Sequence, residues 1–498
     1  MKKLNILLII ISFALVSCEL DKGFEEINVD PTASSDLDVN PKFAYLFLKT
    51  AADEYEVSFT EILCAGQLVQ QVIDQTFPQG SIYSMREDLN YAWWDVQYST
   101  TIKTVVDIID QLGKAGNTGT EMGIARIWKV YIFHKIVDTY GETPYFGAGK
   151  GYIDSNFRPA YDSVELIYMD MLKELEEAVA QIGSSSTLGN ADSVFQGDTQ
   201  KWEKFGNSLM LRLAMRVKNV DPATSSAWVT KAISGGVMTS SADTALMVQT
   251  AGPTDLNKNA WGVYVPRYPR AKIGKTLYDW LVKKDDPRLD ILADPNRKPT
   301  DEGNPYGFKD SDLAATGVDI SDLPYAAVNP EITEIDSPRM FMTYAQTALV
   351  LAEHYAANGD HARAESHYNS AVTSAINQWA LFDASLAVSP ADISAYLTNT
   401  DNAYNSTDAL KMIGEQFWTA SFFDFFEAFS NFRRTGYPEL KPFGEQPAHP
   451  ENLTGGKIPR RLIVNPNEAN VNTENFNAMI SSQGPNTQST RIWWDINQ

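Results

Sequence analysis

The sequence predicts a mostly α-helical protein, in which a tetratricopeptide-like helical scaffold supports an irregular, loop-rich second part. Apolar residues recur at three- and four-residue spacing along most of the chain, which is the period of an amphipathic helix. Strand-like alternation is scarce and short. Gly, Pro, Asp and Asn gather between about 237 and 340 and again from 436 to 498, where loops are expected.

The N-terminus is typical of an exported protein. Lys2 and Lys3 precede an apolar run from Leu4 to Val16. Such a run is a signal-peptide core and is too short to span a bilayer. The small residue before Cys18 resembles a bacterial lipobox, in which the cysteine becomes the lipidated first residue of the mature protein.

We therefore expect residues 1–17 to be a lipoprotein signal peptide and residues 18–40 to be a lipid-anchored acidic leader. No later segment is long and apolar enough to span a bilayer, so the membrane is contacted through the lipid anchor only. The acidic residues after Cys18 fit two interpretations equally, a surface-export signal or a solvated leader. Once the signal peptide is removed, Cys64 is the only thiol, and its helical context predicts a small buried apolar residue.

Residues 41–236 and 341–435 are predicted to form the helical scaffold. Amphipathic runs occupy about 41–73, 91–112, 123–139, 164–179, 199–219, 225–234, 341–357, 361–378 and 408–430. The segment 348–371 fits the tetratricopeptide pattern, and Trp202–Leu209 matches its first helix. Repeats of this kind must stack to bury a continuous core.

Composition excludes several functions. The chain has 498 residues with 41 Lys+Arg against 63 Asp+Glu, a formal net charge of −22. Nucleic acid is therefore not expected as a partner, because phosphate binding needs clustered Lys and Arg. Two cysteines exclude disulfide scaffolds and multi-cysteine metal sites.

Catalytic and metal motifs are lacking in the sequence. It has no His-Glu-x-x-His, Walker, Gly-x-Gly-x-x-Gly or Gly-x-Ser-x-Gly signature, so no enzyme and no cofactor is predicted. The one hint of a cation is an acidic stretch without EF-hand spacing, which suggests a structural Ca²⁺ or simply a solvated surface. Its carboxylates are Asp310, Asp312, Asp319 and Asp322.

Several stretches, in order along the chain, resemble the SusD/RagB-type nutrient-binding outer-membrane lipoproteins. An Ala-Arg helix runs into the turn Tyr140–Tyr145, and a later helix carries Leu-Arg-Leu-Ala-Met-Arg at 211–216. An Ala-Glu…Gly-Asp unit follows at 352–360, and Arg433-Arg434 and Ile458–Arg461 match the late motifs. Phe24–Pro31 and Thr490–Asp495 resemble a divergent SusD-like branch.

This resemblance implies a protein of the outer membrane, lipid-anchored on the cell surface. Such proteins bind oligosaccharides, or in some branches peptides, and deliver them to a SusC-like TonB-dependent transporter. Two alternatives remain: a surface scaffold or lid with no small ligand of its own, and a surface glycan hydrolase.

In such a protein the ligand site is expected on the irregular parts, 237–340 and 436–498. Flat aromatic faces pack against the C–H faces of sugars while polar side chains bind the hydroxyls. Aromatic residues on helical stripes, such as Trp93, Trp94 and the cluster Phe422–Phe429, are instead expected in the core or at a partner interface. The predicted ligand-binding residues are Trp261, Tyr264, Tyr268, Tyr306, Phe308, Tyr325, Tyr83, Arg267 and Asn259.

Overall fold

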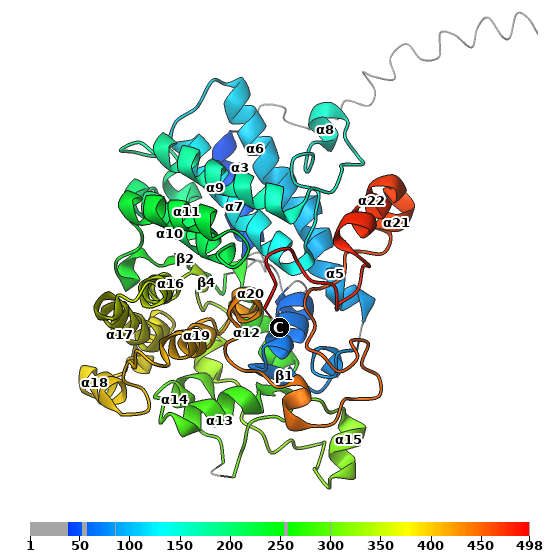
Figure 1. Ribbon diagram of the computed structural model, residues 1–498, viewed down its shortest axis with the longest axis vertical. Helices are drawn as coiled ribbons and strands as arrows, with labels where there is room; N and C mark the ends of the chain where they lie inside the picture. Colours follow the sequence, from blue (N-terminus) through cyan, green and yellow to red (C-terminus); the bar gives the residue numbers. More distant parts are fainter. Residues whose placement is uncertain (1–37, 52–56, 85, 253–256, 299, 498) are drawn as a thin grey trace, which may run out of the picture.

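The computed structural model describes residues 38–51, 57–84, 86–252, 257–298 and 300–497. Helices predominate across these residues, so the prediction of a mostly α-helical protein is confirmed (Figure 1). The predicted signal peptide, Cys18 and the leader up to residue 37 lie outside the described residues. Within the described part of the chain, no helix is long and apolar enough to cross a bilayer.

A first block of helices fills the upper half of the view in Figure 1. Its helices are α3 (Val39–Thr50), α6 (Lys103–Lys114), α7 (Thr120–Tyr140), α9 (Val164–Gln181), α10 (Thr199–Arg216) and α11 (Pro222–Gly235). Helix α9 packs against α7 and α10, and α10 also packs against α11. Gly206 makes this close packing possible, because a Cβ there would lie 2.5 Å from Cγ2 of Val179.

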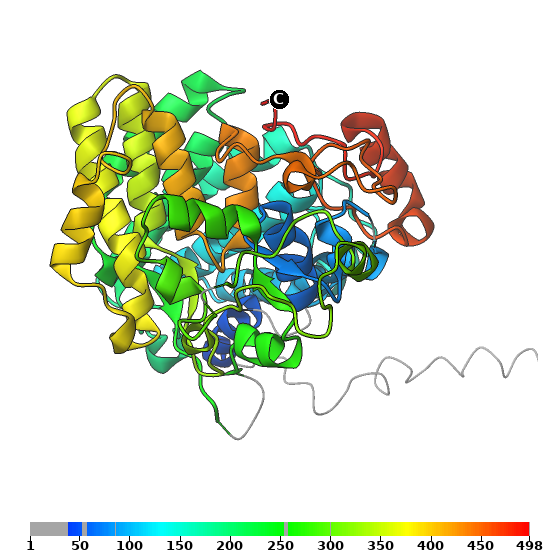
Figure 2. The same cartoon turned by 90° about the horizontal axis from the view of Figure 1, so that it is seen from below.

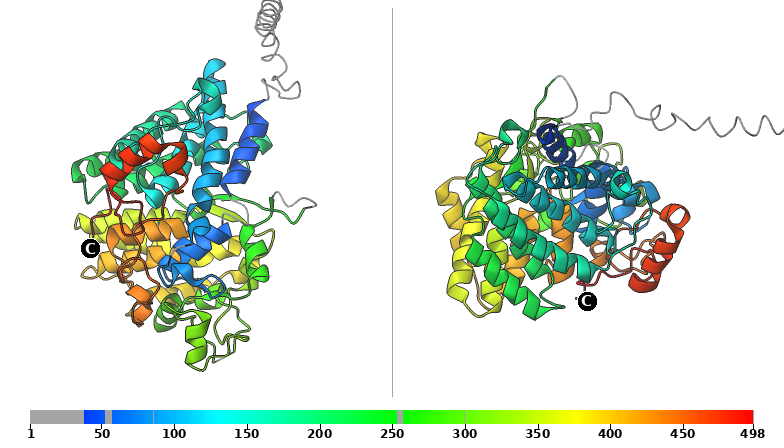
Figure 3. Two further views of the ribbon diagram at one scale, coloured as in Figure 1. Left: turned by 90° about the vertical axis from the view of Figure 1, so that its right-hand side faces the viewer. Right: turned by 90° about the horizontal axis from the view of Figure 1, so that it is seen from above.

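A second block contains the helix pair that the tetratricopeptide pattern predicts. Its helices are α16 (Tyr344–Ala357), α17 (His361–Asn377), α18 (Pro390–Thr398), α19 (Ala409–Ala420) and α20 (Phe425–Thr435). Helices α16 and α17 pack along each other on either side of a turn at Gly359, whose φ is +76°. Figures 2 and 3 show this block on the opposite side of the molecule from α21 (Glu468–Val471) and α22 (Thr473–Gln483).

Buried ion pairs join the two blocks. Arg216 on α10 lies 2.7 Å from Oε1 of Glu427 on α20 and 3.2 Å from Oδ2 of Asp138 on α7. Lys135 on α7 lies 3.1 Å from Oδ1 of Asp424, the residue that precedes α20. Removing one member of such a pair would leave an uncompensated buried charge, so these contacts fix how the blocks meet.

Shorter elements complete the chain. They are two π-helices (Val57–Gly66 and Gln97–Ile102), α5 (Glu87–Val96), α8 (Gly151–Asp154), α12 (Ala260–Arg267), α13 (Lys275–Lys283), α14 (Leu289–Leu292) and α15 (Asp310–Ala315). Single-turn 3₁₀ helices occur at Pro78–Gly80, Gly189–Ala191, Ser241–Asp243, Pro330–Ile332, Gln378–Leu381, Ala384–Leu386 and Pro442–Glu445. Residues 237–340 are thus more helical than the sequence indicates, while the division into a scaffold and a ligand-binding part stays a prediction.

Two small antiparallel sheets link distant segments. Strand β1 (Val72–Asp74) pairs with β3 (Ala271–Ile273), and Asp74 lies opposite Ala271. Strand β2 (Ala245–Met247) pairs with β4 (Arg339–Met342), with an irregular register between Ala245 and Leu246.

The helical aromatic residues assigned to the core are buried. Trp93 and Trp94 are 2% and 4% exposed, and the phenylalanines of 422–429 are all buried. Among the residues of the resemblance, Gly141 has a φ of +85° and ends α7, and a Cβ there would collide with the Gln483 side chain. These hallmarks therefore serve packing and turn formation.

A candidate aromatic ligand site

Strand pairing brings two aromatic residues together at the end of the small sheet. Phe77 lies three residues after β1, and Tyr268 lies three residues before β3. Because β1 and β3 are antiparallel, the end of one meets the beginning of the other. The two ring centroids are 5.8 Å apart and the rings meet edge to face, at 69°. We call this pair the Phe77–Tyr268 platform.

The platform is half-buried and is flanked by arginines. Phe77 and Tyr268 each keep part of their side chain accessible. The Arg86 guanidinium lies 5.1 Å from the Phe77 ring centroid, and that of Arg267 lies 5.8 Å from the Tyr268 centroid. Arg86 also donates hydrogen bonds from Nε and Nη2 to the Asp88 carboxylate. The arrangement offers aromatic edges and faces beside guanidinium donors, a combination that suits the apolar faces and hydroxyls of a sugar.

Buried contacts beneath the platform hold it in place. The Tyr264 ring lies 4.9 Å from that of Tyr268, and the Tyr264 hydroxyl donates to Oδ2 of Asp74 at the end of β1. Burial raises the pKa of Asp74 although several hydrogen bonds, the Tyr264 bond foremost, oppose this. The backbone carbonyl of Phe77 accepts a 2.8 Å bond from the Gln67 amide. Both aromatic residues of the platform are therefore positioned by interior residues.

Trp261 and Asn259, which the sequence assigns to a ligand-binding loop, belong to the interior. Trp261 and Tyr264 lie on helix α12, and their side chains are 2% and 0% exposed. The Trp261 ring packs 4.2 Å from that of Phe423. Asn259 caps α12, since its Oδ1 accepts from the backbone nitrogen of Trp261 and its Nδ2 donates to the Ser337 carbonyl. The expectation of a loop here is wrong because this cap starts a helix.

Tyr83 and Tyr306 are also buried. The Tyr83 ring packs 4.4 Å from Phe443 and 5.9 Å from Tyr306, and the Tyr306 hydroxyl donates to the Gly80 carbonyl. Tyr325 is 9% exposed and packs in a small cluster with Leu313, against which Phe308 is partly buried.

Of the nine residues predicted to bind ligand, Tyr268 belongs to the platform and Arg267 flanks it. Phe77 and Arg86 were not predicted. The sequence does hold a signal for Phe77, because this residue directly precedes the loop Pro78–Ser81, next to which Tyr83 is predicted to bind ligand.

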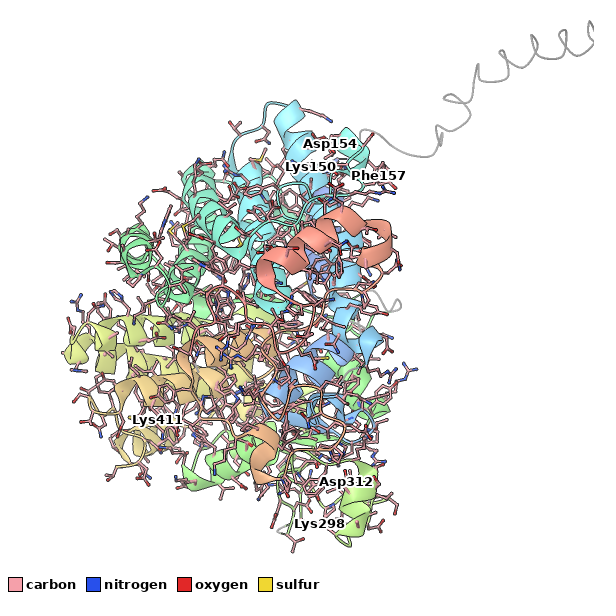
Figure 4. All side chains as sticks on the ribbon, turned by 45° about the vertical axis from the view of Figure 1, so that its right-hand side comes forward. Lys150, Asp154, Phe157, Lys298, Asp312 and Lys411 are labelled. Atoms are coloured by element: carbon pink, nitrogen blue, oxygen red, sulfur yellow. The ribbon has the colours of Figure 1, made fainter. Side chains whose placement is uncertain are left out.

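The carboxylates of the acidic stretch suggested as a Ca²⁺ site form ion pairs and hydrogen bonds with other residues of the protein. Asp310 pairs with Arg270, Asp312 accepts from the backbone nitrogen of Lys309, and Asp319 accepts from that of Ser321. Asp322 lies 3.5 Å from Nζ of Lys298. Figure 4 labels Asp312 and Lys298 at the lower end of the molecule. No group of three or more acidic, histidine or cysteine side chains able to hold a metal ion occurs among the described residues.

Comparisons with known proteins agree with the architecture. The profile of the SusD-like_2 family, described as "Starch-binding associating with outer membrane", matches residues 42–464. No curated protein sequence matches the chain.

Solved structures with similar folds cover nearly the whole chain. A chitin-binding protein is 26% identical over 92% of this chain and 100% of its own, with a TM-score of 0.81. A SusD homologue from Bacteroides uniformis is 24% identical over 93% and 100%, with a TM-score of 0.79. A chitin-binding SusD homologue from Flavobacterium johnsoniae is 22% identical over 92% and 99%, with a TM-score of 0.77.

The family profile covers most of the chain, and the solved structures of similar fold cover nearly all of it. SusD-like proteins bind carbohydrate and are not enzymes, so the prediction that this protein is not an enzyme agrees with its family, and the alternative of a glycan hydrolase does not. The chain belongs to the SusD-like family of starch-binding proteins that associate with the outer membrane.

Proposed function

We propose that this protein is a cell-surface lipoprotein that holds an oligosaccharide at the Phe77–Tyr268 platform and passes it to a SusC-like TonB-dependent transporter. The observation that carries the ligand site is the accessible aromatic pair with an arginine beside each ring. Family membership supports a glycan as the ligand, and two relatives of similar fold are named as chitin-binding proteins.

The mechanism is capture without bond making. A sugar ring placed against Tyr268 or Phe77 buries its C–H face, while Arg86 and Arg267 donate hydrogen bonds to its hydroxyls. Each contact is weak, and several contacts along one chain of sugars add up to useful affinity. A modest affinity also suits delivery, because the ligand must dissociate from this protein before the transporter can take it up.

The ligand site is tested by measuring binding of chitin and starch oligosaccharides, with short peptides as the competing ligand class. We expect Phe77→Ala and Tyr268→Ala to weaken glycan binding roughly tenfold, the loss of one aromatic contact. The matched control is Phe157→Ala, because Phe157 is an aromatic residue that is 72% exposed at the upper end of Figure 4. Equal binding by all three variants, or binding of peptides only, would contradict the proposal.

The anchor and the transporter are tested separately. Lipidation at Cys18 predicts that Cys18→Ser releases the protein from membranes and prevents its labelling with palmitate. Partnership with the transporter predicts that a SusC-like barrel co-purifies with the wild-type protein from detergent-solubilised outer membranes. A protein that binds the barrel but no glycan or peptide would be a scaffold or lid.

A further inference from the structure

A large pocket lies between helix α20 and the C-terminal loops. Its volume is about 790 Å³, a size typical of small-molecule sites. The chain end crosses this region, since Nδ2 of Asn497 donates to the Arg434 carbonyl on α20 (Figure 1). Four basic side chains from three segments line the pocket: Arg433, Lys457, Arg460 and Arg491.

The positive charge is not balanced by nearby carboxylates. Arg460 pairs with Asp495, and Arg491 lies 3.4 Å from the same carboxylate. Among the described side chains of the lining, Glu439 is the one that is acidic. Among the described residues, the four basic side chains of the lining are accompanied by the carboxylates of Glu439 and Asp495, while the nearby Asp138 carboxylate is already paired with Arg216. Positive charge is thus in excess here, in a chain whose net charge is −22. An excess of positive charge at one concave site of so acidic a protein favours an anionic ligand.

Arg433 shows this imbalance most clearly. Its side chain is buried, yet it forms no ion pair with any described residue. Its guanidinium donates instead to the backbone carbonyls of Arg460, at 2.6 Å, Asp138, at 2.5 Å, and Phe429, at 3.2 Å, and to the Ser430 hydroxyl. Burial lowers the pKa of Arg433 to about 9, against the opposing charge of Asp495. An anion in the pocket would stabilise this charge.

Lys457 is the basic residue available to a ligand. It is exposed, and it makes no ion pair within the described ranges. An ammonium group on a flexible stem can reach an anion without rearrangement of the backbone.

The remaining walls suit a sugar better than a bare ion. Phe432, Leu440 and Ile458 provide apolar surface, while Ser489 and Asn497 provide polar groups. We propose that this pocket binds a carboxylate-bearing saccharide, a uronic acid unit, with Lys457 as the group that contacts the carboxylate. The choice of a saccharide rests on the proposed glycan-binding function, but the site is separate from the Phe77–Tyr268 platform.

The experiment is calorimetric titration of the purified protein with an oligogalacturonate, its methyl-esterified neutral form and inorganic sulfate. We expect the acidic oligomer to bind about tenfold more tightly than the ester, as one charge-assisted hydrogen bond allows. This preference should weaken as salt is added. Lys457→Gln should reduce oligogalacturonate affinity by a similar factor. The matched control, Lys283→Gln, removes an exposed lysine of α13 and should change nothing.

Three results would overturn the inference: equal binding of acid and ester, equal affinity in the two lysine variants, or binding of sulfate without binding of the uronate. The platform variant Phe77→Ala separates the two proposals. If it abolishes binding of neutral glycans while the Lys457-dependent preference for the acid persists, both stand. If it leaves neutral glycan binding unchanged, the platform fails although the basic pocket remains.

Discussion

Glu353 on α16 and Arg434 on α20 form a doubly hydrogen-bonded ion pair, with N–O distances of 2.7 and 2.5 Å, inside the second helical block. In the sequence these residues belong to two separate family-like stretches, Ala352–Asp360 and Arg433-Arg434. The structure shows that the two stretches contribute the two halves of one buried contact. A planar guanidinium matches a carboxylate in this way, and lysine could not replace it.

We predict that Glu353→Gln lowers the free energy of unfolding by about 3–5 kcal/mol, because Arg434 is left as an uncompensated buried charge. Chemical denaturation would measure this. The control is Glu365→Gln on the exposed face of α17, which should change stability by less than about 0.5 kcal/mol. Similar losses in both variants would show that the pair contributes nothing specific.

The same pair predicts a pH dependence. Burial would raise the pKa of Glu353, but the charge and hydrogen bonds of Arg434 outweigh it, and the pKa lies below its ordinary value of 4.5. The ionised form therefore stabilises the fold above about pH 4.5, and this contribution is lost as the pH falls through the lower folded-state pKa. Between pH 5 and pH 3, the wild type should lose more stability than Glu353→Gln. Parallel stability curves would contradict this.

Helix packing around Gly206 gives a steric prediction. Gly206→Ala should destabilise the protein by about 1–3 kcal/mol, because the new Cβ would lie 2.5 Å from Val179 and 3.1 Å from Ile127. Gly113→Ala on α6 is the matched control, since a Cβ there meets nothing within 4 Å. That substitution should stabilise the helix by about 0.5–1 kcal/mol. Thermal unfolding of both variants measures the difference.

The Trp261→Ala variant tests whether this residue contributes to stability or to ligand binding. Trp261→Ala removes a buried ring packed on Phe423 and should cost about 3–5 kcal/mol of stability. Because its side chain is inside the fold, glycan affinity measured on the folded fraction should stay within about twofold of wild type. If Trp261→Ala instead lost tenfold in glycan affinity with little loss of stability, Trp261 would be a ligand-binding residue after all.

The Cys64 thiol should be inert in the folded protein. Burial, reinforced by the charge of Asp88, raises its pKa to about 12, so almost no thiolate forms near pH 8. In a Cys18→Ser background, a colourimetric thiol reagent should label Cys64 only after denaturant is added. Rapid labelling of the native protein would mean that this part of the core opens readily.

Helical periodicity predicts much of the scaffold, because helices such as α6 and α9 bury a recurrent apolar face. Helix α7, in contrast, is buried on nearly all sides. Helix α12 is not predicted from the sequence because Pro266 in its last turn and Pro269 just beyond it indicate a loop, and because Asn259 is not recognised as its cap. The burial of Tyr83 and Trp261 could not be predicted from the sequence either, because the rings they pack against, Phe443 and Phe423, are distant in sequence. The resemblance identified the family correctly, while individual ligand residues depend on long-range contacts that one sequence does not reveal.

The platform has the same origin. Phe77 and Tyr268 meet only because three residue pairs join β1 to β3, and local pattern could not predict that pairing.

This arrangement also bears on how the protein can evolve. The two platform side chains, Phe77 and Tyr268, are half-buried at the ends of a small sheet, whereas the helix blocks are joined by buried ion pairs elsewhere in the fold. Substitutions of these two half-buried residues can therefore exchange one sugar preference for another at less cost to folding than substitutions in the buried core. We expect relatives that bind different polysaccharides to differ at these two positions while retaining the helical scaffold.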